Sequence, residues 1–216
     1  MTDGREQSTA IASYWNLVGE RYLELFRDEF EKKPYDRQVV ASFAAGLSAG
    51  ASVCDAGCGP CGHVTRLLAN VGLDAVGVDI SPKCVELARK EQPLLRFELM
   101  DMASMAFPDG AFQGLFCYYA LHYQSKLSLG GVIREFARVL SPGGRLLIVV
   151  KEGASEGWID DPMGSGLRIF WCDFAPEELQ ALVAGNGFEV SGCEVRDPLP
   201  DEIAVRRIFL TARCMG

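Results

Sequence analysis

Histidine is scarce in this sequence, and long apolar runs are missing from it. Of the 216 residues, two are histidines, His63 and His122. His63 stands near Cys58 and Cys61, but no second C-x-x-C pair follows, so we expect no bound metal. The longest aliphatic run, residues 146–150, is too short to cross a bilayer. The N-terminal MTDGREQSTA lacks the apolar core of a signal peptide, so we expect a cytoplasmic location and no membrane partner.

Basic residues are also in the minority. The chain has 21 Lys and Arg against 29 Asp and Glu, which gives a formal net charge of −8 and a pI near 4.9. Nucleic-acid binding relies on clustered Lys and Arg that displace counterions from phosphates. We therefore expect no nucleic-acid partner and favour a small molecule. The cysteines do not indicate a disulfide framework, because four of them lie in apolar, strand-like runs: Cys54, Cys117, Cys193 and Cys214.

Two helical patterns open the chain. From Ile11 to Phe30, apolar residues recur at spacings of three and four, which predicts one long helix with an apolar face. A second helix begins near Pro34 and is ended by Gly46 and Gly50. Both predicted helices precede a glycine-rich stretch.

Strands and helices then alternate. The predicted strands are residues 51–55, 74–79, 94–100, 113–118 and 144–151, with helices over 64–71, 82–90 and 132–140. This alternation predicts right-handed crossovers and a mainly parallel sheet with helices on both faces. In the last third, a helix over 176–184 precedes two strands, 188–196 and 204–214, which form an antiparallel pair. The long connection over 152–174, rich in glycine and aromatic residues, is of a kind that is often functional.

The stretch VCDAGCGPCGHV, residues 53–64, supports three interpretations. Its C-G-P-C has the spacing of a thioredoxin-like redox pair, and its G-x-G-x-x-G matches the dinucleotide-binding fingerprint. Its Asp55, Gly57 and Gly59 match the first motif of methyltransferases that use S-adenosylmethionine. The stretch alone does not choose among them.

The surrounding chain favours an adenosine ligand. A strand ends at Asp55, and a helix begins near Gly62 with free N–H groups facing the ligand. The next strand ends at Asp79, where a carboxylate can accept hydrogen bonds from ribose hydroxyls. In a thioredoxin, the C-G-P-C would instead lie at the start of a helix, and the domain would be smaller. A nicotinamide dehydrogenase would carry a second domain, and its pyrophosphate would be repelled by Asp55.

Five segments in order resemble the class I S-adenosylmethionine-dependent methyltransferases, of the small-molecule type similar to the ubiquinone and menaquinone C-methyltransferases. Within residues 35–213, the segments are VCDAGCGPCGHVTRLLA, AVGVDISPKCVELAR, LRFELMDMASMAFPDGAFQGLFCYYALHY, EFARVLSPGGRLLIVV and FAPEELQALVAGNGFEV. The resemblance implies an α/β, Rossmann-like fold: a seven-stranded, mainly parallel sheet with helices on both faces and an antiparallel C-terminal hairpin. We expect a single domain, divided into a helical lid (1–47), a cofactor-binding core (51–151), a substrate-side connection (152–174) and a terminal helix with hairpin (175–216).

The resemblance also implies S-adenosylmethionine as the cofactor and assigns residues to it by position. At the methionine part, it implies that Gly57 and Gly59 pass underneath, that Asp55 organises the amine and that Tyr118 lines this end. It implies that Asp79 holds the ribose. At the adenine, it implies that Ile80 lies on the ring face, that Asp101 accepts the exocyclic amine and that the Met102 N–H meets a ring nitrogen. Tyr14 and Tyr22, on the apolar face of the N-terminal helix, are expected to cover the cofactor or the acceptor, with a core role as the alternative. The family often has a third glycine where this chain has Cys61, so the tightness of the loop stays open.

The methyl acceptor is defined less sharply. We expect a small molecule that accepts the methyl group on oxygen or nitrogen by direct displacement. His122, in CYYALHY after the fourth strand, is the candidate base, and a packing histidine is the alternative. Two other function classes stay open: a non-catalytic module that binds S-adenosylmethionine or S-adenosylhomocysteine, and a redox enzyme that uses Cys58 and Cys61.

Overall fold

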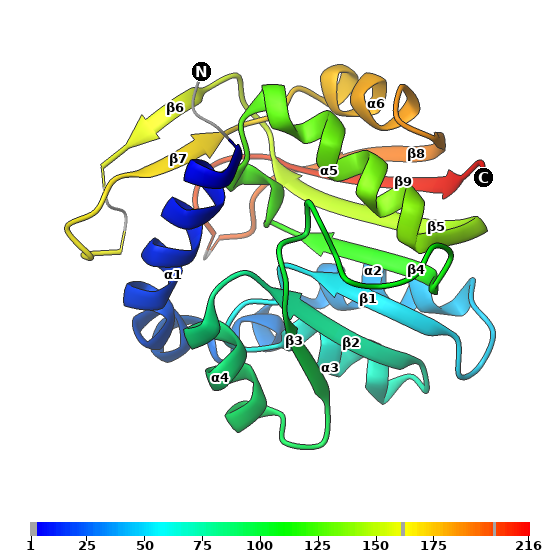
Figure 1. Cartoon of the computed structure of the whole chain (residues 1–216), viewed down its shortest axis with the longest axis horizontal. Coiled ribbons are helices and arrows are strands. Elements are labelled where there is room, and N and C mark those ends of the chain that lie inside the picture. The colour runs from blue at the N-terminus through cyan, green and yellow to red at the C-terminus, as the bar shows by residue number, and fades with distance from the viewer. Residues whose placement is uncertain (1–3, 161–162, 201) are drawn as a thin grey trace.

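A seven-stranded sheet organises the chain (Figure 1). The computed structural model describes residues 4–160, 163–200 and 202–216. In the spatial order β3-β2-β1-β4-β5-β9-β8, the strands are β3 (Arg96–Leu99), β2 (Asp74–Asp79), β1 (Ser52–Ala56), β4 (Phe112–Tyr118), β5 (Leu140–Lys151), β9 (Arg207–Cys214) and β8 (Phe188–Arg196). The first five of these pair in parallel, whereas β9 pairs antiparallel with both β5 and β8. The predicted fold class is confirmed.

Helices cover both faces of the sheet (Figure 1). They are α1 (Gly4–Phe26), α2 (Pro34–Ala45), α3 (His63–Asn70), α4 (Pro82–Glu91), α5 (Lys126–Val139) and α6 (Pro176–Ala184), with short 3-10 turns η1 (Glu29–Lys32) and η2 (Leu121–Tyr123). None of the helices in the described part of the chain combines the length and apolar character that crossing a bilayer requires.

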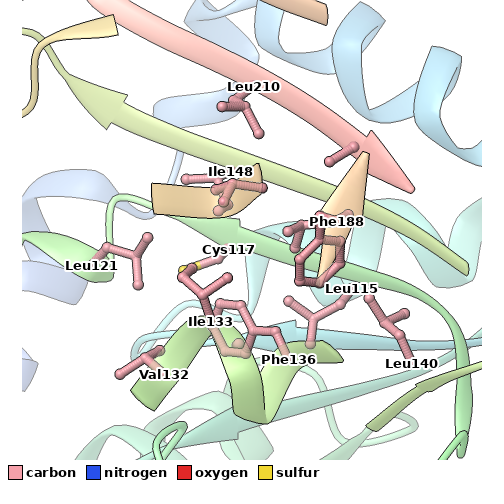
Figure 2. Close-up of a cluster of buried hydrophobic side chains, with 14 of the residues drawn as sticks. Leu115, Cys117, Leu121, Val132, Ile133, Phe136, Leu140, Ile148, Phe188 and Leu210 are labelled. Atoms are coloured by element: carbon pink, nitrogen blue, oxygen red, sulfur yellow. The ribbon is translucent and has the colours of Figure 1, made fainter. Parts of the chain in front are cut away.

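Side chains of the central strands alternate between two buried faces. In β4, Leu115 and Cys117 join the core on one face, and Phe116 joins the core on the other. Figure 2 shows the first core, where Ile133 and Phe136 of α5 lie among strand side chains. The second core lies under α2 and α3. Because both faces are buried, the central strands are largely apolar, as the sequence pattern indicates.

Three elements depart from the sequence prediction. The first helix ends at Phe26, and the separate turn η1 carries the buried Phe30 that continued the apolar pattern. Helix α5 begins six residues earlier than predicted, at Lys126 (132 − 126 = 6), because the side chain of Ser125 caps it by accepting the N–H of Ser128. The predicted connection contains a small antiparallel hairpin, β6 (Glu156–Ile159) with β7 (Ile169–Cys172).

Helix α1 lies across the end of the sheet, between α4 and the β6–β7 hairpin (Figure 1). Its Asn16 side chain accepts the Ser81 hydroxyl at the start of α4 (2.7 Å). Its Gln7 amide donates to the carbonyl oxygen of Tyr123 (3.0 Å). These bonds fix α1 over the carboxyl ends of the parallel strands.

Candidate functional site

A cavity lies at the carboxyl ends of the strands β1, β2 and β4, beneath α1. Its lining includes Ile11, Trp15, Tyr22, Asp55, Gly57, Cys58, Gly59, Asp79, Ile80, Asp101, Met102, Tyr118, Tyr119 and Tyr123. Ligands of open α/β sheets bind at this edge. The structure therefore brings all of the sequence-predicted cofactor residues together in one cavity, with the exception of Tyr14.

The glycine-rich turn forms the floor of the cavity. Gly57 has a φ of +77°, and a Cβ there would lie 2.3 Å from the Cβ of Ala120, so no side chain fits. Its N–H donates to the carbonyl oxygen of Val78 (2.8 Å), which ties the turn to strand β2. Gly62, with a φ of +58°, precedes α3 and packs against Phe97. Gly62 thus adopts the left-handed backbone conformation, which would be strained at a residue with a side chain such as Cys61.

Asp55 is a buried carboxylate at the end of β1. Its Oδ2 accepts two hydrogen bonds from Thr65, one from the backbone N–H (2.9 Å) and one from the hydroxyl (2.7 Å). Burial, together with the nearby charge of Asp79, raises the pKa of Asp55 to about 7, although the two bonds from Thr65 lower it. A cation bound in the cavity would favour the ionised form.

Asp79 ends the neighbouring strand β2. Its Oδ2 accepts the N–H of Gly59 (3.0 Å), and its Oδ1 accepts the N–H of Ser81 (2.9 Å). Burial raises the pKa of Asp79 to about 6, although these backbone bonds favour the charged form. The backbone N–H of Ile80 also contributes to Asp79, and a carboxylate with its roughly four lone-pair positions can still accept a ligand hydroxyl.

Asp101 connects the cavity to the lid helix. Its Oδ2 accepts the hydroxyl of Ser8 on α1 (2.6 Å), and its Oδ1 accepts the N–H of Ala103 (2.9 Å). Met102 follows in the lining, and its Cε lies 3.1 Å from the position of a Cβ on Gly57. The adenine-side residues of the prediction and the lid are therefore in direct contact.

Tyr118 forms part of the far wall. Its hydroxyl donates to Oδ1 of Asp36 on α2 (2.6 Å), and Phe30 packs against its ring at 5.1 Å. The Asp36 carboxylate is itself buried and lies 3.5 Å from the Arg196 guanidinium. Since its hydroxyl is anchored behind the wall, Tyr118 presents its ring to the cavity.

Of the two tyrosines predicted to cover the cavity, helix α1 places Tyr22 in the lining and Tyr14 outside it. Tyr14 is 1% exposed and packs with Val18 and with Ile169 of β7, outside the cavity lining. Trp15 and Tyr22 line the cavity instead, and their rings contact each other at 5.2 Å. Successive helix positions point about 100° apart, so neighbouring residues on one apolar pattern face different partners.

His122 occupies a structural position. It is fully buried, and its Nε2 accepts the backbone N–H of Lys151 (2.9 Å), so its Nδ1 donates to the carbonyl oxygen of Cys172 (2.6 Å). Its ring stacks on Trp171 at 4.4 Å, and burial lowers the pKa of His122 to about 3. Because both nitrogens are occupied by backbone groups and the ring lies outside the cavity lining, the expected base role is corrected to a packing role.

The C-G-P-C thiols lack the character of a redox pair. All eight cysteines are free. Burial raises the pKa of Cys61 to about 12, with Glu29 adding to it, and burial raises the pKa of Cys58 well above the ordinary value. Redox cysteines need a lowered pKa, so this geometry does not favour the redox alternative.

Comparison with known proteins places this site in a family. Residues 53–144 match the family described as a methyltransferase domain, and that range contains the glycine turn and the three strand-end aspartates. Demethylmenaquinone methyltransferase of Tropheryma whipplei is 35% identical over 107 residues, which cover 48% of this chain and 43% of that protein. Over this range the chain is similar to methyltransferases.

Other relatives carry different names. Demethylmenaquinone methyltransferase of Deinococcus radiodurans is 30% identical over 118 residues, 53% of this chain and 46% of that protein. The S-adenosyl-L-methionine-dependent Diels-Alderase iccD of Talaromyces variabilis is 35% identical over 114 residues, 49% of this chain and 38% of that protein. The chain spans less than half the length of these curated relatives.

Solved structures share the fold of this chain. The 1,6-didemethyltoxoflavin-N1-methyltransferase of Burkholderia thailandensis, solved with 1,6-didemethyltoxoflavin and S-adenosylhomocysteine, matches 100% of this chain and 92% of its own, with a TM-score of 0.77 and 21% identity. A methyltransferase of Methanosarcina mazei covers 82% of this chain and 97% of its own, with a TM-score of 0.73 and 19% identity.

Sequence reasoning missed residues that support the methyltransferase site from outside its motifs. Thr65 fixes Asp55 from the first turn of α3, and Ser8 reaches Asp101 from the lid. Trp15 belongs to the same apolar pattern as Tyr14, and the pattern gave no signal to separate them. Only the packing of α1 identifies which of the two faces the cavity.

Proposed function

We propose that this methyltransferase transfers the methyl group of S-adenosylmethionine to an oxygen or nitrogen atom of a small molecule. The observation that carries the proposal is the convergence of Asp55, Asp79 and Asp101, from three successive strand ends, on one cavity beside a glycine turn. Buried carboxylates gain their charge when a cation binds nearby. S-adenosylmethionine brings such charges in its amine and its sulfonium.

Each lining residue has a proposed task toward the cofactor. At the methionine part, Gly57 and Gly59 lie underneath, Asp55 organises the amine and Tyr118 lines the end. Asp79 accepts the ribose hydroxyls. At the adenine, Ile80 and Met102 contact the ring and Asp101 accepts the exocyclic amine. Tyr22 has the covering role expected of it, and Trp15 takes the one expected of Tyr14. The turn depends on glycine at position 57, because a Cβ there would lie 2.3 Å from the Cβ of Ala120.

Positioning supplies the catalysis in this proposal. The cofactor provides an electrophilic methyl group, and the chain holds the acceptor in line with it and excludes water. With His122 bonded to the backbone, no histidine base is assigned. Relatives named for demethylmenaquinone and phosphoethanolamine support a small acceptor. The net charge of −8 supports our expectation that no nucleic acid is bound, and we keep a cytoplasmic location as an expectation.

Calorimetric titration tests the proposal. We expect S-adenosylmethionine and S-adenosylhomocysteine to bind at micromolar level and NAD not to bind. Asp79→Ala removes the ribose acceptor and should weaken both adenosyl ligands at least about tenfold, or about 1.4 kcal/mol. Asp74→Ala, at the exposed start of the same strand, is the matched control and should bind like the wild type. Equal binding by wild type and Asp79→Ala, in folded protein, would refute the assignment.

A second candidate is binding of the cofactor without methyl transfer. One structural observation favours it. Among the described residues, the histidine that lines the cavity is His63, and its Nε2 is hydrogen-bonded to the carbonyl oxygen of Arg27 (2.6 Å). No free histidine base in the described chain therefore faces the cavity. The relative named a Diels-Alderase also bears a function other than methyl transfer in its name. Formation of S-adenosylhomocysteine with any member of an acceptor panel would exclude this candidate.

A further inference from the structure

A second group of side chains lies beside the cavity, where strands β4 and β5 end. Lys151 is the last residue of β5, and its register partner on β9 is Arg207. Tyr119 follows β4 directly, and its N–H donates to the carbonyl oxygen of Val149 (2.8 Å). Tyr119 also lines the cavity and so connects this group to it, whereas Lys151 and Trp171 are not among the lining residues.

Lys151 is a half-buried cation that faces aromatic rings. Its Nζ lies 4.8 Å from the ring centre of Trp171 and 6.0 Å from that of Tyr119. It forms no ion pair with any residue that the structure describes. Lys33 approaches the same Tyr119 ring at 5.5 Å, but Lys33 is paired with Glu29 at 2.5 Å. Lys151 is thus the cation of this group whose charge is not matched by a carboxylate.

The charges around Lys151 favour an added anion. Burial lowers the pKa of Lys151, and the charges of Arg207 on β9 and Lys33 before α2 lower it further. Asp173, after β7, and Glu29, in η1, act in the opposite direction. Asp173 also accepts the indole N–H of Trp171 (2.7 Å), and Glu29 accepts Lys33. Both nearby carboxylates therefore already have partners.

The rings beside Lys151 form fixed walls. Trp171 is held from behind by His122, which stacks on it with an interplanar angle of 5°. Tyr119 has a φ of +56°, which is a strained backbone for a residue with a bulky side chain. Its hydroxyl is buried near the Arg207 guanidinium but makes no hydrogen bond of standard geometry with the described residues. Strain and an unsatisfied polar group together are typical of a functional site.

We propose that Lys151 binds the deprotonated acidic group of a planar acceptor, an enol, a phenol or a ring N–H, next to the rings of Tyr119 and Trp171. This inference rests on the proposed function and names its substrate class. The acceptor loses its proton to solvent, and its lone pair attacks the methyl carbon of the sulfonium. The new bond to carbon forms as the sulfur–carbon bond breaks, and that electron pair stays on sulfur as the neutral thioether. The ammonium of Lys151 lowers the pKa of the acceptor, so the reaction needs no histidine base.

The test measures ionisation of a bound probe rather than turnover. The holo form, saturated with S-adenosylhomocysteine, is titrated with 4-nitrophenol across pH, and the phenolate is followed by its visible absorbance. We expect the protein to lower the apparent pKa of the bound phenol and to bind the phenolate at least tenfold more tightly than 4-nitroanisole, its uncharged analogue. Lys151→Gln should lose both effects, whereas Lys151→Arg, which keeps the charge, should retain tenfold discrimination. Lys32→Gln, on the exposed surface, is the matched control and should behave as wild type.

Several results would overturn the inference. The first is a wild-type protein that binds neither compound or both equally, a result that does not depend on any variant folding. The second is that folded Lys151→Gln binds the phenolate as tightly as the wild type. The third is that Lys151→Arg and Lys151→Gln lose the preference for phenolate over 4-nitroanisole to the same extent. Binding of S-adenosylhomocysteine is measured first in the same samples. If it binds and the phenolate effects are missing, the substrate class is refuted while the proposed function stands.

Discussion

Replacing Asp55 with Asn isolates the cost of burying a carboxylate at the end of β1. The substitution keeps the shape of the side chain, and the amide oxygen can accept both hydrogen bonds that Thr65 donates. It removes one ionisable proton from a residue that is 1% exposed. Any change in the pH dependence of stability therefore reports the charge rather than packing.

The sign follows from the direction of the pKa shift. Burial raises the pKa of Asp55 from 3.8 to about 7, so the folded chain holds this proton more tightly than the unfolded chain. As pH rises, the unfolded state releases the proton first, and the free energy of unfolding falls between the two pKa values. With about 1.4 kcal/mol for each pH unit between them, the whole fall is about 4 kcal/mol. The Asp55→Asn variant lacks this contribution, because an amide side chain does not ionise.

Urea unfolding of the ligand-free protein at pH 5, 6, 7 and 8 measures the difference. We expect the stability of Asp55→Asn relative to wild type to increase by about 2–3 kcal/mol from pH 5 to pH 8. Asp74→Asn, an exposed aspartate in the same sheet, should show no comparable trend. A pH-independent difference between Asp55→Asn and wild type would refute the reasoning and indicate that Asp55 ionises normally.

The remaining predictions concern packing around the site. Gly57→Ala should destabilise the protein by about 3 kcal/mol or more in urea unfolding, because it adds an overlap with Ala120 to the left-handed strain. Gly59→Ala, with a φ of +63° and open space, should cost only about 1–2 kcal/mol; equal losses would contradict the overlap. His122→Phe should cost about 2–4 kcal/mol by leaving two backbone groups unpaired, while residual methyl transfer keeps its pH profile. A shifted pH–rate profile would restore His122 as a base.

Much of the fold could be predicted because its local signals agree with one another. The alternation of apolar strands with amphipathic helices places β1, β2, β4 and β5 within a few residues of their observed bounds. The departures occur where tertiary contacts compete with the pattern. Phe30 continues the helical spacing of α1 although its backbone has left the helix, because its ring is buried in the core with Tyr118.

The residues predicted to hold the cofactor line one cavity for a similar reason. Strand ends and glycine turns can be identified from short local stretches of sequence. The parallel topology then brings Asp55, Asp79 and Asp101 to one edge of the sheet. The acceptor side could not be predicted. Lys151, Tyr119 and Trp171 come from separate elements, and nothing in their local sequence relates one to another.

The sequence by itself determined the sheet, its glycine turn and the carboxylates at its strand ends, because backbone conformation and side-chain alternation are local properties. The tertiary structure alone decided which side chains are free to act. In the folded chain, Tyr14 packs in the core and Trp15 lines the cavity. Both nitrogens of His122 are hydrogen-bonded to backbone groups. Lys151 has no carboxylate partner among the described residues. Burial and hydrogen-bond partners depend on residues far apart in the chain, and these set the charge and reactivity of each group.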